Sequence, residues 1–570
     1  MYLQIGQSNG RDYLVIVQGY RDPVTKKVRH KTVKSLGYLE DLKKQFSDPV
    51  SHFRAVAKQM THEAALEKQG DNVRYRSGVT LPKGGTSRKN IGYAAISRLY
   101  HELGLHVFFS NHSRAFKARF NTNNIMKLLI YSRILFPASK KKTYEDRNVY
   151  FENTEFSLDD VYRCLTQVAT FKDKLQRHLH RQIKDKYDRT TELVYYDVTN
   201  YYFEIDEEDK NRRLGVSKEH RPDPIIQMGL LLDTMGIPIM YDLFPGNTND
   251  CGTLLPILDK VKKEYEIGRT IVVADKGINT ADNVAYCLAK GDGYVYSQTV
   301  RRASKELKSY VLDPRGYKES EDGFRIKSRL YPREIAVSNA RGGRTKVRID
   351  EKQVIFYSPD YDRKAKRDRE NAISKAKELV KDPSKYKRAI SYGAAKYVKN
   401  LVFDHKKGEF VTSKAKPVFD EDRLCEEEKF DGYYAIVTSE CEKSDKEIIE
   451  IYRGLWRIEE AFKVTKSDLE ARPVYLSRED HIETHFLICF VALVLIRLLA
   501  YALDNRFSVS KIIESLGKTA GTQSGSNWYI FNHSDEVLEA IADTMDIKLD
   551  NQYMKLGEIK SLIGATKKAK

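Results

Sequence analysis

The sequence predicts an α/β protein with a basic, mainly helical region before its core sheet. Between residues 191 and 300, runs of apolar, β-branched and aromatic residues alternate with segments of helical periodicity, in the order β-β-β-α-β-α-β. Residues 91–190 repeat apolar residues at helical spacing. Hydrophobic residues make up 41% of the 570 residues and charged residues 31%, a balance that supports a sizeable core and excludes wholesale disorder.

The first 85 residues are predicted to form a small β unit followed by a linker helix. Residues 13–17 are apolar and β-branched, residues 22–26 favour a turn, and residues 28–33 favour a return strand. The pattern becomes helical at about residue 50 and then reaches a linker containing Gly and Pro. The basic helical region follows over residues 86–190.

The core is expected to be built from two separate stretches, residues 191–300 and 431–505. The first stretch contains five strand-like runs. Its fourth run, residues 270–274, is fully apolar, as is typical of a strand buried on both faces. Residues 301–430 interrupt the core and are predicted to be a mainly β insertion that also contains a charged helix.

Two helices are predicted after the insertion. The first is a single long helix over Ser444–Leu469. The second, over Leu487–Leu503, is apolar most of the way round, which is typical of a helix packed in the core. A helical C-terminal region is expected over residues 506–570.

The positive charge of the chain is concentrated in two blocks. Lys and Arg number 98 against 80 Asp and Glu, a formal net charge of +18. Residues 1–150 carry a net +16 and residues 301–420 a net +15, so the remainder is acidic at −13. Basic blocks attract polyanions through counterion release, and nucleic acid is the commonest such partner. Lysine-rich, solvated helix faces are the alternative interpretation.

Several classes of protein are excluded. The six cysteines are dispersed without a C-x-x-C pair, which excludes a disulfide scaffold and a zinc ribbon. No signal peptide is apparent, and the apolar run Phe486–Ile496 is too short to cross a bilayer, so we expect a soluble protein in a reducing compartment, without a membrane partner. Residues 83–87 lack the spacing of a P-loop, so no nucleotide cofactor is expected.

Three acidic residues occupy positions that favour function. Asp197 interrupts an otherwise excellent strand, Asp275 ends the apolar fourth strand, and Glu459 lies among apolar residues of the long helix. Because Mg²⁺ and Mn²⁺ prefer oxygen ligands, the three carboxylates could hold a pair of such ions. A turn-capping Asp275, a solvated Glu459, or Glu460 in its place are alternatives that the residues leave open.

The long helix also carries a motif. Its residues 452–466 read Tyr-Arg-Gly-Leu-Trp-Arg-Ile-Glu-Glu-Ala-Phe-Lys-Val-Thr-Lys. This resembles the Tyr-x2-Arg-x3-Glu-x6-Lys pattern of bacterial insertion-sequence transposases of the DDE type. Tyr452, Glu459 and Lys466 match in register, whereas Leu455 stands at the position of the motif Arg, between Arg453 and Arg457.

The resemblance implies a ribonuclease-H-like catalytic core interrupted by a β-rich insertion. In that family the acidic residues matching Asp197, Asp275 and Glu459 are catalytic and hold two Mg²⁺ or Mn²⁺ ions. The implied activity is binding of the terminal inverted repeats of an insertion sequence, cutting of the DNA at its ends, and joining of the 3′-hydroxyl ends to target DNA. A bacterial, nucleoid-associated protein of the cytoplasm is expected.

The partner implied by the resemblance is double-stranded DNA, both of the element ends and of the target. A homodimer is expected by analogy with the family, because two ends must be brought together. Candidate DNA contacts fall into three groups: Tyr452, Arg453, Arg457, Lys466 and Lys276 near the acidic residues; Arg341 and Arg344 at a hairpin-like turn in the insertion; and the cluster Lys140, Lys141 and Lys142 in the helical region.

The sequence leaves two alternative functions open. A nuclease of the same fold would cut DNA with Mg²⁺ without joining a 3′-hydroxyl to a target. A DNA-binding protein derived from a transposase would have lost catalysis; the three filled acidic positions argue against it, whereas Leu455 keeps it open.

Overall fold

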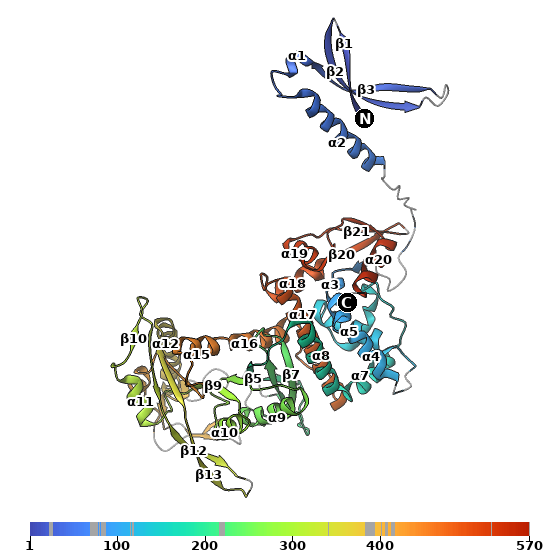
Figure 1. Ribbon diagram of the computed structural model, residues 1–570. Helices are drawn as coiled ribbons and strands as arrows, with labels where there is room; N and C mark the ends of the chain where they lie inside the picture. The colour runs from blue at the N-terminus through green and yellow to red at the C-terminus, as the bar shows by residue number, and fades with distance from the viewer. Residues whose placement is uncertain are drawn as a thin grey trace. The chain divides into compact units, whose positions relative to one another are not determined.

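The computed structural model describes residues 1–8, 10–21, 27–68, 78, 80, 87–114, 116, 119–215, 223–339, 341–381, 394–400, 402–404, 409–411, 416–525 and 527–568. The chain divides into two compact units, Met1–Thr80 and Leu81–Lys570, which are described separately (Figure 1).

The N-terminal unit is a three-stranded antiparallel sheet with a long helix. The sheet has the order β1-β2-β3, and the side chains of Leu14 and Ile16 on β2 are fully buried. The predicted strand and return strand are confirmed in β2 and β3, and β1 is an additional strand; the predicted turn at 22–26 lies outside the described residues. The elements are β1 (Tyr2–Ser8), β2 (Arg11–Arg21), β3 (Val28–Tyr38), α1 (Leu39–Leu42) and α2 (Pro49–Lys68).

The larger unit has a helical body around α17 (Glu479–Ala502). By length and composition α17 could cross a membrane, but 89% of its apolar window is buried in the protein, and it packs against helices from both ends of the unit, as expected of a core helix. Besides α17, the body contains α3 (Tyr93–Glu102), α4 (Leu105–Arg114), α5 (Thr122–Leu135), α6 (Lys140–Glu145), α7 (Leu158–Ala169), α8 (Lys172–Tyr187), α18 (Val509–Lys518), α19 (Glu536–Met545) and α20 (Leu556–Thr566).

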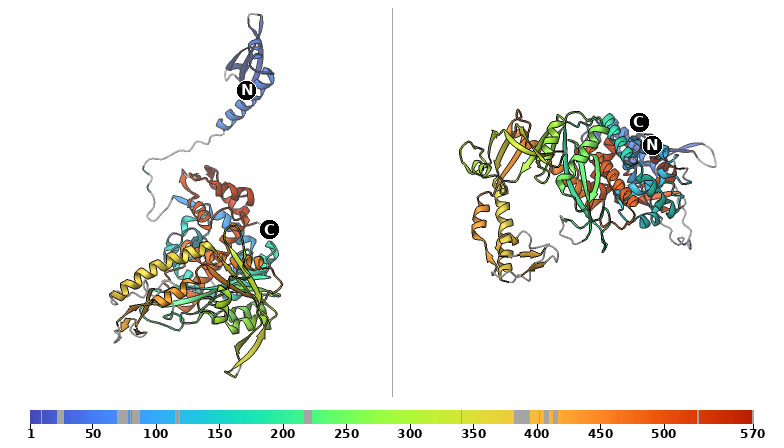
Figure 2. Two further views of the ribbon diagram at one scale, coloured as in Figure 1. Left: turned by 90° about the vertical axis from the view of Figure 1, so that its left-hand side faces the viewer. Right: turned by 90° about the horizontal axis from the view of Figure 1, so that it is seen from below.

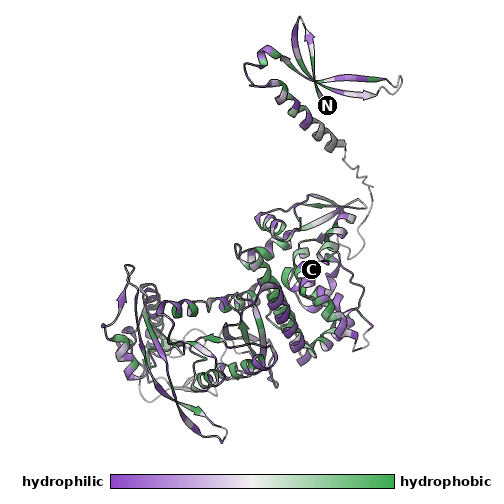
Figure 3. Cartoon of the chain, in the orientation of Figure 1, coloured by the Kyte–Doolittle hydropathy of each residue, from purple (hydrophilic) through white to green (hydrophobic). Residues whose placement is uncertain are grey.

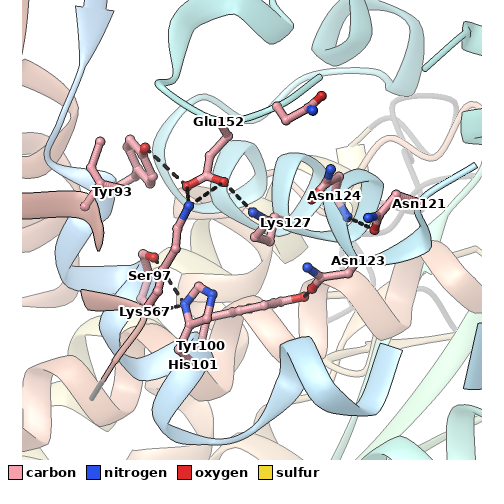
Figure 4. A network of polar contacts seen from close by, with 12 residues as sticks. Tyr93, Ser97, Tyr100, His101, Asn121, Asn123, Asn124, Lys127, Glu152 and Lys567 are labelled. Atoms are coloured by element: carbon pink, nitrogen blue, oxygen red, sulfur yellow. Dashed lines mark hydrogen bonds and ion pairs between the residues drawn. The ribbon is translucent and has the colours of Figure 1, made fainter. Parts of the chain in front are cut away.

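The C-terminal region completes this helical body. Strand β4 (Arg88–Asn90) pairs with β20 (Ala520–Ser524), which continues into β21 (Trp528–Phe531) and β22 (Tyr553–Lys555). Near the end of the chain, Lys567 joins a buried ion pair between Lys127 and Glu152, and the Tyr93 hydroxyl donates to the same carboxylate at 3.4 Å (Figure 4). The burial of this network ties α3, α5 and the C-terminal end together.

We expect Glu152→Gln to lower the free energy of unfolding by about 2 kcal/mol. The substitution keeps the shape of the side chain but leaves the buried Lys127 ammonium without a compensating charge. Chemical denaturation of the purified protein measures the change. Glu514→Gln, which breaks an exposed ion pair with Lys518, is the matched control and should leave stability nearly unchanged. Equal effects of the two substitutions would contradict a structural role for the buried network.

The core sheet has nine strands in the order β10-β11-β14-β19-β9-β8-β5-β6-β7. Strands β5, β8 and β9 are parallel, whereas β6 runs antiparallel to β5 and β7 runs antiparallel to β6. The predicted order of elements is confirmed, with the fourth core strand, β8, inside the sheet. Those five strands are β5 (Leu193–Tyr202), β6 (Ile225–Leu232), β7 (Pro238–Pro245), β8 (Ile271–Ala274) and β9 (Gly293–Gln298).

Two cores cover the two faces of the sheet. On one face, Tyr196 and Ala274 pack with α9 (Leu254–Glu264) and α10 (Ala281–Ala289). On the other face, Tyr195 and Val273 pack in the large core that includes α17. Hydrophobic residues line the inner strands and helices, as the green segments in Figure 3 show.

Part of the insertion lengthens the core sheet, and the pairs β12-β13, β15-β18 and β16-β17 form separate two-stranded sheets. Strands β10 (Lys318–Glu319), β11 (Arg325–Leu330) and β14 (Lys352–Tyr357) extend it beyond β19 (Tyr433–Thr438), because β14 pairs with β19 in antiparallel register. Figure 2 shows α12 and α14 extending from this end of the sheet. The other elements are α11 (Lys305–Leu312), β12 (Arg333–Ser338), β13 (Arg344–Ile349), α12 (Pro359–Lys381), β15 (Val398–Lys399), β16 (Val402–Asp404), β17 (Glu409–Val411), β18 (Val418–Phe419) and α14 (Glu421–Glu428).

The prediction of one uninterrupted helix over Ser444–Leu469 is wrong. The segment consists of α15 (Asp445–Arg453), α16 (Trp456–Lys463) and a π-helical turn, η4 (Val464–Asp468). Between α15 and α16 the backbone tightens, since the amides of Leu455 and Arg457 donate to carbonyls three residues earlier. Sequence periodicity does not reveal such a break, because it comes from close packing of the helix on the sheet.

Candidate active site

Asp197 and Asp275 lie side by side on neighbouring strands. The last register pair of the parallel strands β5 and β8 joins Tyr196 to Ala274, and the two aspartates are the next residues. Such strands are about 4.8 Å apart. Because side chains alternate along a strand, both aspartates face the same side of the sheet as Tyr195 and Val273, and both are half-buried. The fold therefore brings together two carboxylates that are 78 positions apart in sequence.

Asp275 is held by hydrogen bonds from two other elements. The Ser297 hydroxyl on β9 donates to Asp275 Oδ1 at 2.7 Å, and the Tyr452 hydroxyl on α15 donates to the same oxygen at 3.3 Å. Burial, followed by the nearby Asp275 charge, raises the pKa of Tyr452, so its hydroxyl keeps its proton. Tyr452 thus fastens α15 over the carboxyl end of β8.

Ser297 is a site residue that sequence reasoning missed. It occupies an ordinary position in the fifth core strand, and only the pairing of β8 with β9 brings it next to Asp275. No short motif around it carries a signal. The contact could have been predicted only from the order of the strands, with β9 placed beside β8.

The helical segment crosses the sheet on the face that carries both aspartates. The Arg457 guanidinium lies 5.8 Å from the Tyr195 ring, and Lys466 Nζ lies 5.6 Å from the Tyr201 ring further along β5. Glu459 lies between these two points on α16, and its side chain is exposed. Both Glu459 and Asp275 contribute to the raised pKa of Tyr434, behind burial and Tyr361, so both charges lie near one phenol.

Glu460 has a structural role instead. Its carboxylate forms an ion pair with the buried Arg497 of α17 at 2.7 Å, which holds α16 onto the helical body. Of the two adjacent glutamates, Glu459 therefore remains the one available to a ligand. Leu455, at the position of the motif Arg, is buried in the core, whereas Arg453 is exposed and Arg457 lies over the Trp456 ring at 5.3 Å.

A cavity of about 550 Å³ opens beside Asp275. It extends between the end of β9, α12 of the insertion and the residues before β19, and its wall combines cations with aromatic rings. Lys276 is exposed at its edge, and the exposed ring of Tyr434 lies 4.8 Å from that of Tyr361. A groove with basic and aromatic walls suits a nucleic acid backbone and its bases.

The donor chemistry suits a hard divalent cation. Asp197, Asp275 and Glu459 supply carboxylate oxygens, which Mg²⁺ and Mn²⁺ prefer over nitrogen or sulfur. Among the described residues no group of three or more His, Cys, Asp or Glu side chains is already gathered closely enough to hold a metal ion. Two adjacent carboxylates with an exposed third nearby fit a site that substrate phosphate oxygens complete.

The predicted DNA contacts outside this site have different surroundings. Arg341 and Arg344 are exposed at the turn between β12 and β13. Lys141 and Lys142 are exposed on α6, and Lys142 pairs with Asp146 at 2.9 Å. Lys140 is buried, with its ammonium 3.3 Å from His485 Nδ1. The three lysines therefore do not form one exposed cluster, because the side chain of Lys140 turns into the helical body.

We expect Ser297→Ala to slow DNA cleavage about tenfold, because Asp275 loses its shortest hydrogen bond and with it part of its fixed orientation. Single-turnover cleavage measures the change. Ser439→Ala, which removes a hydrogen bond to the backbone at the opposite end of β9, is the control and should leave the rate within about twofold. An unchanged rate in Ser297→Ala would contradict the positioning role.

Comparisons with known proteins agree with the resemblance of the helical motif to DDE transposases. Residues 218–495 match the model of the transposase DDE domain, a range that includes Asp275 and Glu459 and begins after Asp197. With its ribonuclease-H-like strand order and adjacent aspartates, the protein is a transposase of the DDE class. Residues 4–71 match the model of the N-terminal domain of IS1634 family transposases.

One solved structure to which the chain is similar is described as "Mos1 transposase paired-end complex with left transposon end". The two are 14% identical, the match covers 42% of this chain and 66% of that chain, and the TM-score is 0.14. No curated protein matches the chain.

Proposed function

We propose that the protein binds the terminal inverted repeats of an insertion sequence, cuts the DNA at its ends and joins the 3′-hydroxyl ends to target DNA. The observation that carries this proposal is the position of Asp197 beside Asp275, under the helical segment that holds Glu459. A bare binding protein has no use for two adjacent half-buried carboxylates on this sheet face.

Asp197, Asp275 and Glu459 would hold divalent cations, Mg²⁺ or Mn²⁺, two of them by analogy with the family. When bound, these ions supply Lewis-acid activation of the attacking oxygen and stabilisation of the leaving oxygen. The chain itself orients the carboxylates: Ser297 and Tyr452 hold Asp275, and the ion pair of Glu460 with Arg497 sets the position of α16.

Cations around the site would hold the DNA backbone. Lys276 at the cavity edge and the exposed Arg453 are placed to contact phosphates, as are Arg457 and Lys466 along the helical segment. Tyr452 acts through Asp275. Arg341, Arg344, Lys141 and Lys142 are exposed cations further away, where they would contact more distant phosphates of the element ends.

The test is incubation of the protein with Mg²⁺, a target plasmid and a DNA fragment that carries the ends of the element. Joined products support the proposal. Cleavage without joining would support a nuclease instead, and a gel shift without cleavage would support a DNA-binding protein. Two element ends held in one complex by two copies of the chain, measured by mass photometry, would support the proposed homodimer.

A further inference from the structure

A second cavity, of about 330 Å³, lies between the start of α6, α17 and the residues that follow the π-helical turn. Four basic side chains and one imidazole line it, against one carboxylate among the described lining residues. They are Arg133, Lys140, Lys141, Arg472, His485 and Glu470.

Lys140 is a buried cation in this wall, and it pairs with no carboxylate in the part of the chain that the structure describes. Its side chain is almost fully buried, and its ammonium donates to His485 Nδ1 at 3.3 Å. His485 Nε2 donates to the Ala471 carbonyl at 3.0 Å, which leaves Nδ1 as the acceptor. Burial, then Lys140 and Arg133, lower the pKa of His485 well below its ordinary value, so the imidazole stays neutral. Lys127, by contrast, is buried against Glu152.

Arg133 adds a second buried cation. Its Nη1 donates to the carbonyls of Leu469 and Glu470 at 3.2 Å and its Nη2 to that of Ala138 at 3.0 Å, while its Nε has no acceptor among the described residues. Carbonyl dipoles orient the guanidinium without neutralising it. No carboxylate of the described ranges neutralises either of these two buried cations, and such burial destabilises a fold unless a ligand supplies the missing charge.

The cavity is connected to the active site through the chain. Leu469 and Glu470, which accept from Arg133, directly follow the turn that carries Lys466. The Arg472 guanidinium lies 5.8 Å from the Tyr202 ring at the end of β5. Asp197 lies five residues earlier on β5, or about 16 Å at the usual rise of a strand. Along one strand of duplex DNA this corresponds to about five nucleotides.

We propose that this cavity binds one phosphate group of the DNA backbone, with Lys140 and Arg133 as its partners, a few nucleotides from the bond that is cut. The inference rests on the proposed function, because it takes DNA as the substrate. Lys141 is exposed at the edge of the cavity, and Tyr475, 73% exposed, offers a ring to an adjacent sugar or base. These flanking groups favour a phosphate within a polymer over a free anion.

Binding at this site couples to the protonation of Lys140. Burial, followed by the Arg133 charge, lowers the pKa of Lys140 to about 7. The buried Cys489 thiol also lies nearby, 4.0 Å from His485 Nε2. An entering phosphate favours the ammonium and raises that pKa, so DNA binding near neutral pH takes up a proton. Of the other charged groups that line the cavity, Lys141 and Glu470 are exposed and Arg472 is half-buried.

The test is the affinity for a DNA fragment with the element ends, measured as a function of salt and pH in an Asp275→Asn background that does not cut. In Lys140→Met we expect affinity to fall roughly tenfold and the slope of log K against log salt to drop by about one. The loss of affinity between pH 6.5 and 8.5 should shrink as well. Lys263→Met removes an exposed lysine that pairs with Asp259 on α9, outside the proposed DNA contacts, and should change neither slope nor pH dependence.

Folding is checked separately. Because the folded pKa of Lys140 lies below its ordinary value, the unfolded chain binds more protons between about pH 7 and 10.5, and this lysine makes stability rise with pH over that window. Lys140→Met removes this dependence and should be more stable at pH 7. Lys140→Gln, which can still donate to His485, provides a second neutral variant. It should lose the pH dependence of stability to the same extent.

Three results would overturn the inference. An unchanged salt slope in both neutral variants would do so, and so would affinity lost equally in Lys263→Met. Stabilisation by inorganic phosphate that depends on Lys140, with no change in DNA affinity, would assign the cavity to a free anion. If the unsubstituted protein binds no DNA at all, the proposed function fails first, which the same titration reveals.

Discussion

Asp275→Asn is expected to reduce DNA cleavage and strand transfer by at least about 10³-fold while the protein still binds the element ends. The substitution removes one negative charge from the pair formed with Asp197, which weakens any hold on a divalent cation and the several kcal/mol of charge stabilisation that the cation supplies. An asparagine Oδ1 still accepts from Ser297 and Tyr452, so the fold around the site is retained. Single-turnover cleavage and a gel shift measure the two properties.

The adjacent glutamates provide an internal control for this prediction. Glu459→Gln should reduce cleavage to a similar extent without loss of stability, because its exposed carboxylate has no structural partner among the residues that the structure describes. Glu460→Gln breaks the ion pair with Arg497, so it should lower the melting temperature and leave most of the cleavage at low temperature. The reverse pattern would assign the third acidic role to Glu460. Asp197→Ala is expected to abolish both steps with end binding intact, and lost binding in that variant would contradict a purely catalytic role.

The core of the fold was predictable because local patterns determine it. The fully apolar run at residues 270–274 gave the buried β8, and alternating strand and helix patterns gave the order of the five core strands. What these patterns could not indicate is pairing over long distance. That β14 joins the core sheet through β19, and that β4 pairs with β20, depends on contacts between segments far apart in sequence.

The candidate site, too, could be predicted only in part from local sequence patterns. Asp197 and Asp275 could be singled out because an aspartate in or after an apolar strand conflicts with propensity. Three features of the site could not be predicted, because they depend on strand register and on the packing of the helices. They are the proximity of the two aspartates, the hydrogen bond from Ser297, and the ion pair between Glu460 and Arg497. Lys140 illustrates the limit most clearly. Three consecutive lysines look alike in sequence, and only the packing of the start of α6 against α17 determines which of them is buried.

Gly454→Ala is expected to slow cleavage about 100-fold through the position of Glu459. A Cβ at residue 454 would lie 1.9 Å from the Tyr195 hydroxyl and 2.5 Å from the ring carbon that bears it, well inside contact distance. Relief requires the junction of α15 and α16 to move away from β5, and a displacement of about 1 Å at a reacting group can reduce a rate 10²-fold. Single-turnover cleavage with the element ends measures the effect.

Helix propensity predicts the opposite sign for this substitution, which makes the result informative. Gly454 has ordinary right-handed dihedral angles, and alanine favours a helix over glycine by about 1 kcal/mol. The change is opposed by the contact with the buried Tyr195 and by a second contact, at 2.8 Å, with Nη1 of the longer and more adaptable Arg457 side chain. Tyr195→Leu shortens the opposing side chain, and the double variant should therefore recover part of the activity lost in Gly454→Ala. Gly564→Ala, at a helical position with no atom within 4 Å of the added methyl group, should be neutral. Full activity in Gly454→Ala would mean that the close approach of the helix to β5 does not set the position of Glu459, and the carboxylate would have to reach the aspartates by movement of its own side chain.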